Sequence, residues 1–366
     1  MRIIAVYRVF CSREDISRKA EALAIEQSVE MPVEAIADQW VREEIVGRLD
    51  GITDCGDGSF RVIVSLSAAT VGSEPGQLMN MLFGNSSIHE DVTLEDAELP
   101  PPLLEAFGGP RAGISGLRTR VGRPRQALTC AAIKPQGLSP AALADLTFRF
   151  GLGRIDFIKD DHALADQPYA PFRERVVACA VASRRAAAET GHPTRYVPNL
   201  SGNLDQLRKQ AAIARGEGLD TLLIAPMLVG LPAFHAIRQE NPDMAFLAHP
   251  AFAGAARIAP PLLLGKLFRL LGADAVIFPH HGGRFGYSPA TCEAIARIAR
   301  EPLGALLPAM PVPAGGMTLD RLPEILKFYG QDTMILIGGG LLAAGDRLTQ
   351  QAEAFASQVE ALSAEQ

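Results

Sequence analysis

From about residue 127 onwards, the sequence alternates between short runs typical of buried β-strands and longer stretches with the apolar spacing of helices. Several of the helical stretches begin with Ser, Asp or Pro and end at Gly, as helix caps require. Eight strand–helix units match a (β/α)8 barrel in number and size, whereas the competing doubly wound sheet rarely needs eight evenly spaced units. The strand-like runs are residues 127–133, 155–158, 195–199, 221–226, 245–250, 275–278, 305–311 and 333–340.

The first hundred residues follow a different pattern. A predicted strand at 3–10 and a predicted helix at 13–27 precede turn-rich β patterning at 51–70. A Pro- and Gly-rich passage at 98–113 then leads into the barrel. We therefore predict an N-terminal ferredoxin-like α+β domain over residues 1–110 and a barrel domain over residues 111–366.

Composition narrows the possible partners. A net charge of −6 provides no basic field, which argues against nucleic acid or an anionic membrane as the main partner. The five cysteines lie far apart without a C-x-x-C motif, which is typical of reduced thiols. No run approaches the ~18 uninterrupted apolar residues of a membrane span. We expect a soluble, cytoplasmic protein that binds a small molecule.

Chemistry-bearing residues follow the predicted strands. In such a barrel, the residues after each strand line one mouth, where catalysis takes place. The residues at these positions are Lys134 after the first strand, Lys159, Asp161 and His162 after the second, Asn199 after the third, His249 after the fifth, His280, His281 and Arg284 after the sixth, Gly315 and Gly316 after the seventh, and Gly338, Gly339 and Gly340 after the eighth.

The predicted strand at 155–158 is followed by four titratable residues, Lys159-Asp160-Asp161-His162, where turn-forming residues are usual. A solvated ion pair is one reading of a lysine beside carboxylates, but the strand context directs these side chains into the mouth. A desolvated lysine loses its proton more easily and becomes a nucleophile. It could add CO2 to form a carbamate, which with Asp161 would bind a hard divalent ion. It could instead form a Schiff base, as in an aldolase.

Two glycine pairs after the last two strands indicate a phosphate site. Glycines let backbone N–H groups approach phosphate oxygens closely, and barrels commonly bind phosphate after strands seven and eight. Plain tight turns are the alternative for either pair alone. Arg284 could hold the phosphate or a substrate carboxylate. His280 and His281 could supply a second acid–base pair.

Several of these strings resemble a known family. "AAIKPQGLS" at 131–139, "DFIKDDHALADQPYAPFRERV" at 156–176, "LAHPAF", "PAGGM" and "LIGGG" resemble the large chain of ribulose-bisphosphate carboxylase (RuBisCO), and more closely the RuBisCO-like proteins. The resemblance implies a ferredoxin-like domain on a (β/α)8 barrel. It also implies a homodimer, or a multiple of dimers, in which the partner subunit completes each active site.

Position by position, the resemblance implies a set of roles. Lys159 would carry the carbamate, with Asp161 and His162 as further ligands of Mg2+ or another divalent metal, although the family normally has a glutamate in place of His162. Lys134 would move protons at the enediolate. The remaining implied site residues are Asn85, Glu26 and His249 in the catalytic site and Gly315, Gly316, Gly338 and Gly339 around one phosphate.

The departures from the family pattern matter as much. Gln136 replaces a lysine of the carboxylase, Pro250 replaces the arginine of the second phosphate site, and Ala314 replaces its serine. A bisphosphate would leave charges nearly uncompensated in a partly buried pocket, which costs several kcal/mol or more. We therefore expect a single phosphate and no CO2 fixation.

The resemblance leaves the substrate open. One branch of the family acts on phosphorylated keto-sugar acids of the 3-oxo-isoapionate 4-phosphate type, by decarboxylation or by transcarboxylation with hydrolysis, and "FPHHGGRFGYSP" at 278–289 resembles it. The alternatives are the 2,3-diketo-5-methylthiopentyl-1-phosphate enolase of methionine salvage and a non-catalytic sugar-phosphate-binding homologue. The enolases tend to have a lysine in place of Asn85. All catalytic readings share deprotonation or C–C cleavage next to a carbonyl, as a lyase or an isomerase, through a metal-stabilised enediolate.

Overall fold

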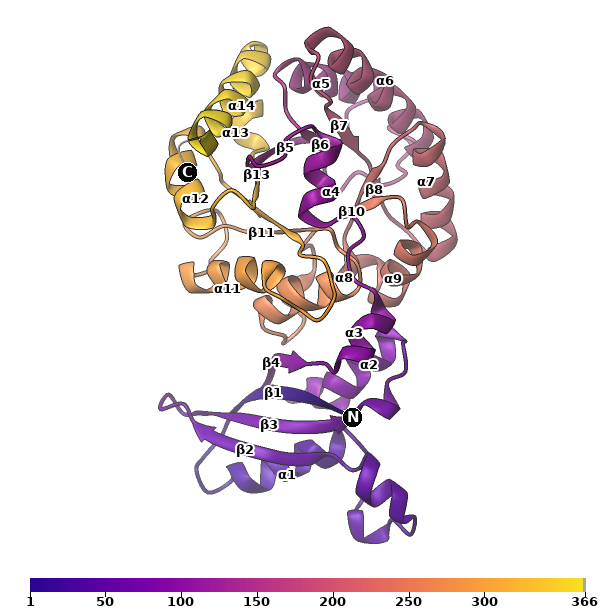
Figure 1. The fold of residues 1–366 in the computed structure, drawn as a ribbon, viewed down its shortest axis with the longest axis vertical. Helices are drawn as coiled ribbons and strands as arrows, with labels where there is room; N and C mark the ends of the chain where they lie inside the picture. The colour runs from indigo at the N-terminus through magenta and orange to yellow at the C-terminus, as the bar shows by residue number, and fades with distance from the viewer. Residues whose placement is uncertain (365–366) are drawn as a thin grey trace. The chain divides into compact units, whose positions relative to one another are not determined.

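The computed structural model describes residues 1–364, which form two compact units (Figure 1). The first unit comprises residues 1–108 together with two short segments, 252–263 and 304–306, and the second comprises the remaining described residues. None of the described helices is long and apolar enough to cross a membrane.

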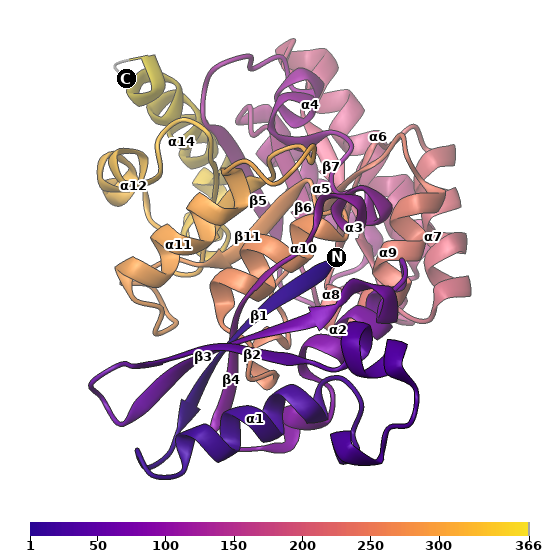
Figure 2. The same cartoon turned by 60° about the horizontal axis from the view of Figure 1, so that its bottom comes forward.

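The first unit is built on a four-stranded antiparallel sheet in the order β2-β3-β1-β4. Alternate residues of β1 are buried, from Ile3 to Val9, as expected for a strand with one covered face. The helix α1 lies along one face of the sheet (Figure 2). The βαββαβ order is that of a ferredoxin-like domain, which confirms the predicted fold. The elements are β1 (Arg2–Phe10), α1 (Ile16–Glu26), β2 (Arg48–Asp54), β3 (Ser59–Ser67), α2 (Pro75–Phe83), β4 (Val92–Glu98) and α3 (Pro101–Phe107).

The second unit is a ring of parallel strands surrounded by helices (Figure 1). Its strands are β5 (Leu128–Ile133), β6 (Phe157–Asp160), β7 (Arg195–Val197), β8 (Asn199–Leu200), β9 (Thr221–Ile224), β10 (Ala245–Ala248), β11 (Ala275–Pro279), β12 (Met310–Ala314) and β13 (Met334–Leu336). Its helices are α4 (Gly113–Arg120), α5 (Pro140–Leu152), α6 (Phe172–Thr190), α7 (Leu204–Gly216), α8 (Pro226–Val229), α9 (Leu231–Glu240), α10 (Phe268–Leu270), α11 (Pro289–Arg300), α12 (Leu322–Tyr329), α13 (Gly339–Leu342) and α14 (Leu348–Ala364).

The strands pair in two ladders, β13-β5-β6-β7 and β12-β11-β10-β9-β8. At one junction, Pro198 separates β7 from β8 because it has no backbone N–H to donate, so these two pieces act as one barrel strand. At the other junction, the hydroxyl of Thr333, just before β13, donates to the carbonyl of Pro311 in β12 at 3.1 Å. The predicted eight-stranded barrel is therefore confirmed.

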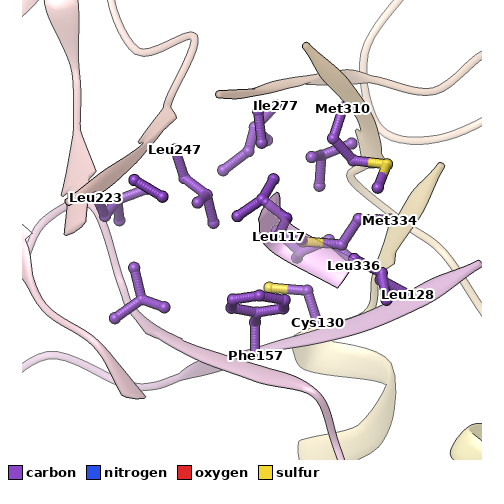
Figure 3. Packing of buried hydrophobic residues seen from close by; sticks show 14 of the residues in the cluster. Leu117, Leu128, Cys130, Phe157, Leu223, Leu247, Ile277, Met310, Met334 and Leu336 are labelled. Carbon is purple, nitrogen blue, oxygen red and sulfur yellow. The ribbon is translucent and has the colours of Figure 1, made fainter. Parts of the chain in front are cut away.

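The barrel is filled by apolar side chains from the strands and from α4 (Figure 3). Leu117 of α4 is fully buried among Phe157, Leu247 and Met334. The start of this helix is held by the fully buried carboxylate of Asp274, which accepts three N–H groups from residues 111–113 at 2.7–3.0 Å. Its other oxygen accepts from Phe246 at 2.8 Å. Burial raises the pKa of Asp274, and these N–H donors act against that rise.

The seventh barrel strand was predicted too early. The prediction covered residues 305–311, whereas β12 spans Met310–Ala314 and pairs with β11. The segment before β12 is held by contacts outside the sheet: Ala309 donates its N–H to the carbonyl of Ala299, and the carbonyl of Pro308 accepts the N–H of Ile114. Arg269 donates to the carbonyl groups of Ile298, Glu301 and Leu307 at 2.7–3.0 Å.

Candidate active site

The position of Lys159 follows from strand alternation. In β6, Phe157 belongs to the barrel core, so Lys159 two residues later lies on the same inward face and Asp160 on the opposite face. The structure extends β6 through Asp160, two residues beyond the predicted strand end. Lys159 is 3% exposed, and its amine donates to the carbonyl of Asp160 at 2.8 Å.

Asp160 serves the opposite face of the strand. Its carboxylate is fully buried and accepts hydrogen bonds from Arg175 Nε on α6 at 3.1 Å and from the Tyr196 hydroxyl on β7 at 2.7 Å. It also accepts the backbone N–H of Asn199 at 3.0 Å. These partners satisfy both carboxylate oxygens. Asp160 therefore connects β6 to α6, β7 and β8, and it has no free oxygen for a ligand.

Asp161 faces a different environment. Lys134 Nζ lies 2.7 Å from one carboxylate oxygen of Asp161. The other oxygen accepts the backbone N–H of Ala163 at 3.0 Å and lies 3.2 Å from Nδ1 of His162. Burial acts to raise the pKa of Asp161, but the hydrogen bonds from His162, Lys134 and Ala163 outweigh it and hold the pKa well below its usual range. Asp161 is thus a carboxylate at neutral pH.

The surroundings of the Lys159 amine favour loss of its proton. Burial lowers the pKa of Lys159, and the nearby charge of Lys134 acts in the same direction, while Cys130 and Asp161 oppose it. A neutral, buried amine is the form that reacts with electrophiles such as CO2 or a carbonyl. The solvated ion pair considered for this lysine is wrong, since its side chain is buried.

His162 and His249 lie against each other. Their rings stack with centroids 4.1 Å apart and an interplanar angle of 10°. Nδ1 of His249 accepts the backbone N–H of Ala251 at 3.1 Å, so in the neutral ring Nε2 carries the proton. Burial lowers the pKa of His249 well below its ordinary value, and the charges of Lys159 and His162 add to this effect. His249 is therefore a neutral donor at this end of the barrel.

Asn199, which was predicted to follow the third strand, lies in β8. Its side-chain amide donates to the carbonyl groups of His162 and Leu164 at 3.0 and 2.9 Å. Its amide nitrogen therefore holds the loop that carries the metal-ligand candidates, while its side-chain oxygen is buried without a hydrogen-bond partner among the described residues.

The glycine loops lie beside these residues. Gly315 and Gly316 have φ values of +88° and +84°, in the left-handed region that favours glycine. A Cβ on Gly338 would lie 3.8 Å from Cε of Lys134, whereas a Cβ on Gly339 would meet nothing within 4 Å. A Cβ on Gly340 would lie 3.0 Å from the carbonyl oxygen of Met317, so the two loops are neighbours.

Arg284 lies next to the first glycine loop. Its backbone N–H donates to the carbonyl of Gly315 at 3.3 Å, and its exposed guanidinium lies 5.5 Å from the ring centre of Phe285. A Cβ on Gly316 would contact the backbone of Arg284 at 3.2 Å. The predicted arginine and glycines are thus brought together.

His280 is held in a network that sequence reasoning did not include. Its ring is fully buried, with Nδ1 2.8 Å from the Tyr329 hydroxyl and Nε2 3.2 Å from Nη2 of Arg321. Burial, with the charges of His281 and Arg321, lowers its pKa to about 4. Neutral His280 with both nitrogens engaged does not support the acid–base role considered for it.

The ligand atoms of His280, His281 and Glu324 lie within 4.8 Å of one another, close enough to share a metal ion. However, Arg321 already lies 3.2 Å from His280 Nε2 and 3.0 Å from Glu324. A divalent cation would have to displace this positive charge, so the cluster fits a hydrogen-bonded network better than a metal site.

Glu26 and Asn85, also predicted as site residues, lie in the first unit. The amide of Asn85 donates to the Glu26 carboxylate at 3.0 Å, so the structure brings these two residues together. Arg175, Tyr196 and Arg321 were not predicted as site residues, because the contacts that fix their roles, with Asp160 for the first two and with His280 for Arg321, join different elements of the fold.

Comparisons with known proteins agree with this geometry. Residues 113–366 match the ribulose bisphosphate carboxylase large chain, catalytic domain. Ribulose bisphosphate carboxylase-like protein 1 of Rhodopseudomonas palustris is 57% identical over 98% of this chain and 97% of its own. A 5-methylthioribulose-1-phosphate isomerase of Rhodospirillum rubrum is 55% identical over 98% and 96%. The crystal structure of a Rubisco-like protein from Rhodopseudomonas palustris has a TM-score of 0.92 and 52% identity, and the match covers 98% of this chain and 97% of that one. The chain therefore belongs to the RuBisCO large-chain family, among its RuBisCO-like members rather than the CO2-fixing enzymes.

Proposed function

We propose that this protein is an isomerase of a ketose carrying one phosphate, of the 5-methylthioribulose 1-phosphate type. The observation that carries the proposal is that two lysines in different surroundings lie at one barrel mouth. Lys134 Nζ lies 2.7 Å from a carboxylate oxygen of Asp161, while Lys159 is buried with a lowered pKa. An acid and a base next to each other are what proton transfer between neighbouring carbons requires. The name of the Rhodospirillum rubrum relative supports the reaction class.

The phosphate would be held by the two glycine loops. Gly315 and Gly316 follow β12, and Gly338 and Gly339 follow β13, in the position where barrels commonly bind phosphate. Arg284 adds an exposed positive charge beside them. Pro250 and Ala314 offer no charge for a second phosphate, so the far end of the substrate would be uncharged.

The reaction would proceed through an enediolate. A base removes the proton on the carbon next to the carbonyl. The electron pair of that C–H bond forms the C=C bond of the enediolate, and the π pair of the carbonyl moves onto its oxygen. The Lys134 ammonium and the neutral His249 ring are the donors that would stabilise the negative oxygen. The neighbouring hydroxyl then gives up its proton and becomes the new carbonyl, while the former carbonyl carbon and its oxygen each take up a proton. The isomerisation is complete without a redox co-reactant.

The residues present fit a carbamate and a divalent metal. The Lys159 amine is buried, is directed toward the barrel interior and is hydrogen-bonded to a neutral carbonyl. A carbamate on Lys159, a carboxylate oxygen of Asp161 and an imidazole nitrogen of His162 would form the ligand set. When bound, the metal would polarise the substrate carbonyl. The carboxylate of Asp161 would then interact with both Lys134 and the metal.

We also propose that the protein is a cytoplasmic homodimer with shared active sites. Glu26 and Asn85 would be the residues through which one subunit completes the site of the other. The proposal rests on the family resemblance and on the hydrogen bond that holds this pair in one orientation.

The test is turnover of 5-methylthioribulose 1-phosphate in D2O, followed by NMR. We expect isomerisation with deuterium incorporated at the carbon that is reprotonated. Three parallel assays test the alternatives: CO2 release from a 3-oxo-isoapionate 4-phosphate-type acid, enolisation of 2,3-diketo-5-methylthiopentyl 1-phosphate, and borohydride trapping of a Schiff base. Binding of the ketose without isomerisation or deuterium incorporation would support the non-catalytic sugar-phosphate-binding homologue.

His162→Glu is expected to shift the metal preference toward Mg2+, because a carboxylate suits a hard ion better than imidazole does. The measurement is activity and metal affinity with Mg2+, Mn2+ and Zn2+ for both proteins. An unchanged order of metals would show that His162 is not a ligand.

Gly339→Asp is expected to raise KM for the phosphorylated ketose by roughly tenfold to a hundredfold, because like charges repel in a partly enclosed site. The open space around this position lets the new side chain fit without distortion. Gly339→Asn, which adds the same volume without charge, is the control. Equal loss with a non-phosphorylated analogue would place the phosphate elsewhere.

A further inference from the structure

Charged groups converge in a second place, at the opposite end of the barrel from Lys134 and Asp161. The site is a cavity of about 300 Å³. Its lining residues are Arg118, Arg125, Arg300, Gly330, Gln331 and Asp332. They lie at the ends of α4 and α11 and in the segments before β5 and β13. These are the amino ends of the strands, so the cavity is separate from the glycine loops, which follow the carboxyl ends.

One of the three arginines is neutralised within the chain. Arg118 pairs with Asp332 at 2.7 Å, and its other guanidinium nitrogens donate to the carbonyls of Gln126 and Gln331 at 3.1 and 2.8 Å. Among the described residues that line the cavity, Asp332 is the one acidic side chain. Its carboxylate forms an ion pair with Arg118, and although its charge also acts on Arg300, neither of the other two arginines forms an ion pair with it.

Arg300 and Arg125 are those two. Arg300 donates to the carbonyls of Ala296 and Tyr329 at 3.0 and 2.6 Å, which fixes its orientation without neutralising it. Burial lowers the pKa of Arg300, so its charge is held in a poorly solvated position. The exposed Arg125 guanidinium makes no hydrogen bond or ion pair with any residue in the described part of the chain.

We propose that this cavity binds a phosphate group, either as inorganic phosphate or on a small metabolite. Two unpaired guanidinium groups match the roughly two negative charges of a phosphate at neutral pH. Arginine binds phosphate through charge-assisted N–H donors. Backbone carbonyls hold Nε and Nη1 of Arg300, which leaves Nη2 without a partner among the described residues. The volume is at the lower end of small-molecule sites, which leaves room for a short organic portion.

The test separates this cavity from the barrel mouth. Inorganic phosphate is titrated calorimetrically into the full-length chain at constant ionic strength. Gly339→Asp weakens the mouth site, and we expect that variant to retain one phosphate-binding event of unchanged affinity. Adding Arg125→Ala to it should weaken this event roughly tenfold or more. Because Arg125 is exposed, its loss should not affect folding.

Arg297→Ala is the matched control, since Arg297 lies on the same helix as Arg300, is exposed and pairs with Glu301. If Arg125→Ala and Arg297→Ala weakened phosphate binding equally, the loss of affinity would follow from the change in net charge alone, and the proposal would be overturned. Complete loss of binding in Gly339→Asp alone would also overturn it. Ribose 5-phosphate in place of phosphate identifies the source: tighter binding assigns the site to a phosphorylated metabolite, and equal binding assigns it to inorganic phosphate.

Discussion

Lys159→Met is expected to lower kcat by about a thousandfold or more while leaving the fold intact. Methionine fills the same buried space without a nitrogen, so carbamate formation and base chemistry are both lost. Because the amine of Lys159 pairs with a single neutral carbonyl, its removal leaves no charged partner uncompensated. The measurements are steady-state kinetics and the free energy of unfolding.

A readout independent of turnover accompanies this prediction. With 13C-labelled CO2 and Mg2+, the native protein should show a carbamate carbon signal that Lys159→Met lacks. Lys209→Met, at an exposed position on α7, is the control and should retain both signal and activity. Full activity in Lys159→Met would exclude this residue from the chemistry.

Asp160→Ala is expected to lower the free energy of unfolding by about 3–5 kcal/mol, because it leaves the fully buried Arg175 guanidinium without its counter-charge. The Tyr196 hydroxyl and the N–H of Asn199 lose their acceptor as well. Urea denaturation of the two proteins measures the difference.

Two further variants sharpen this test. Asp160→Leu combined with Arg175→Met removes both charges and should recover the part of the lost stability that comes from the uncompensated guanidinium, although the Tyr196 hydroxyl and the Asn199 N–H still lack their acceptor. Asp161→Asn should cost activity with a much smaller loss of stability, since Asp161 contacts the mouth residues Lys134 and His162. If Asp160→Ala and Asp161→Asn proved equally destabilising, the division of roles between these neighbours would be wrong.

Much of the fold could be predicted, because its signals are local. Regular alternation of strand and helix patterns predicts the barrel, and the strand context of the run that begins at Lys159 predicts side chains directed into its mouth. The structure shows that alternation along β6 places Lys159 inward and Asp160 on the opposite face. The strand ends then select Lys134, Lys159, Asp161 and the glycine loops as neighbours. The structure brings these residues of the second unit together.

The errors and omissions come from contacts between distant parts of the chain. Arg175 and Tyr196 lie 15 and 36 residues from Asp160, and no local pattern links them to it. The strand β12 contains Pro311 and Pro313, which lack the N–H that a central strand normally donates. Its true limits depend on pairing with β11 and on Arg269, which a single window of sequence does not contain.

The attachment of α4 by Asp274 has a consequence for how this barrel tolerates change. Asp274 accepts hydrogen bonds from main-chain N–H groups, so substitution of the side chain at Arg111 or Ala112 does not remove these hydrogen bonds. Substitution is constrained at two positions instead, Asp274 and Gly113. At Gly113 φ is +56°, and a methyl group would lie 2.8 Å from the carbonyl oxygen of Pro308. Homologues should therefore vary freely along this stretch while keeping that acid and that glycine.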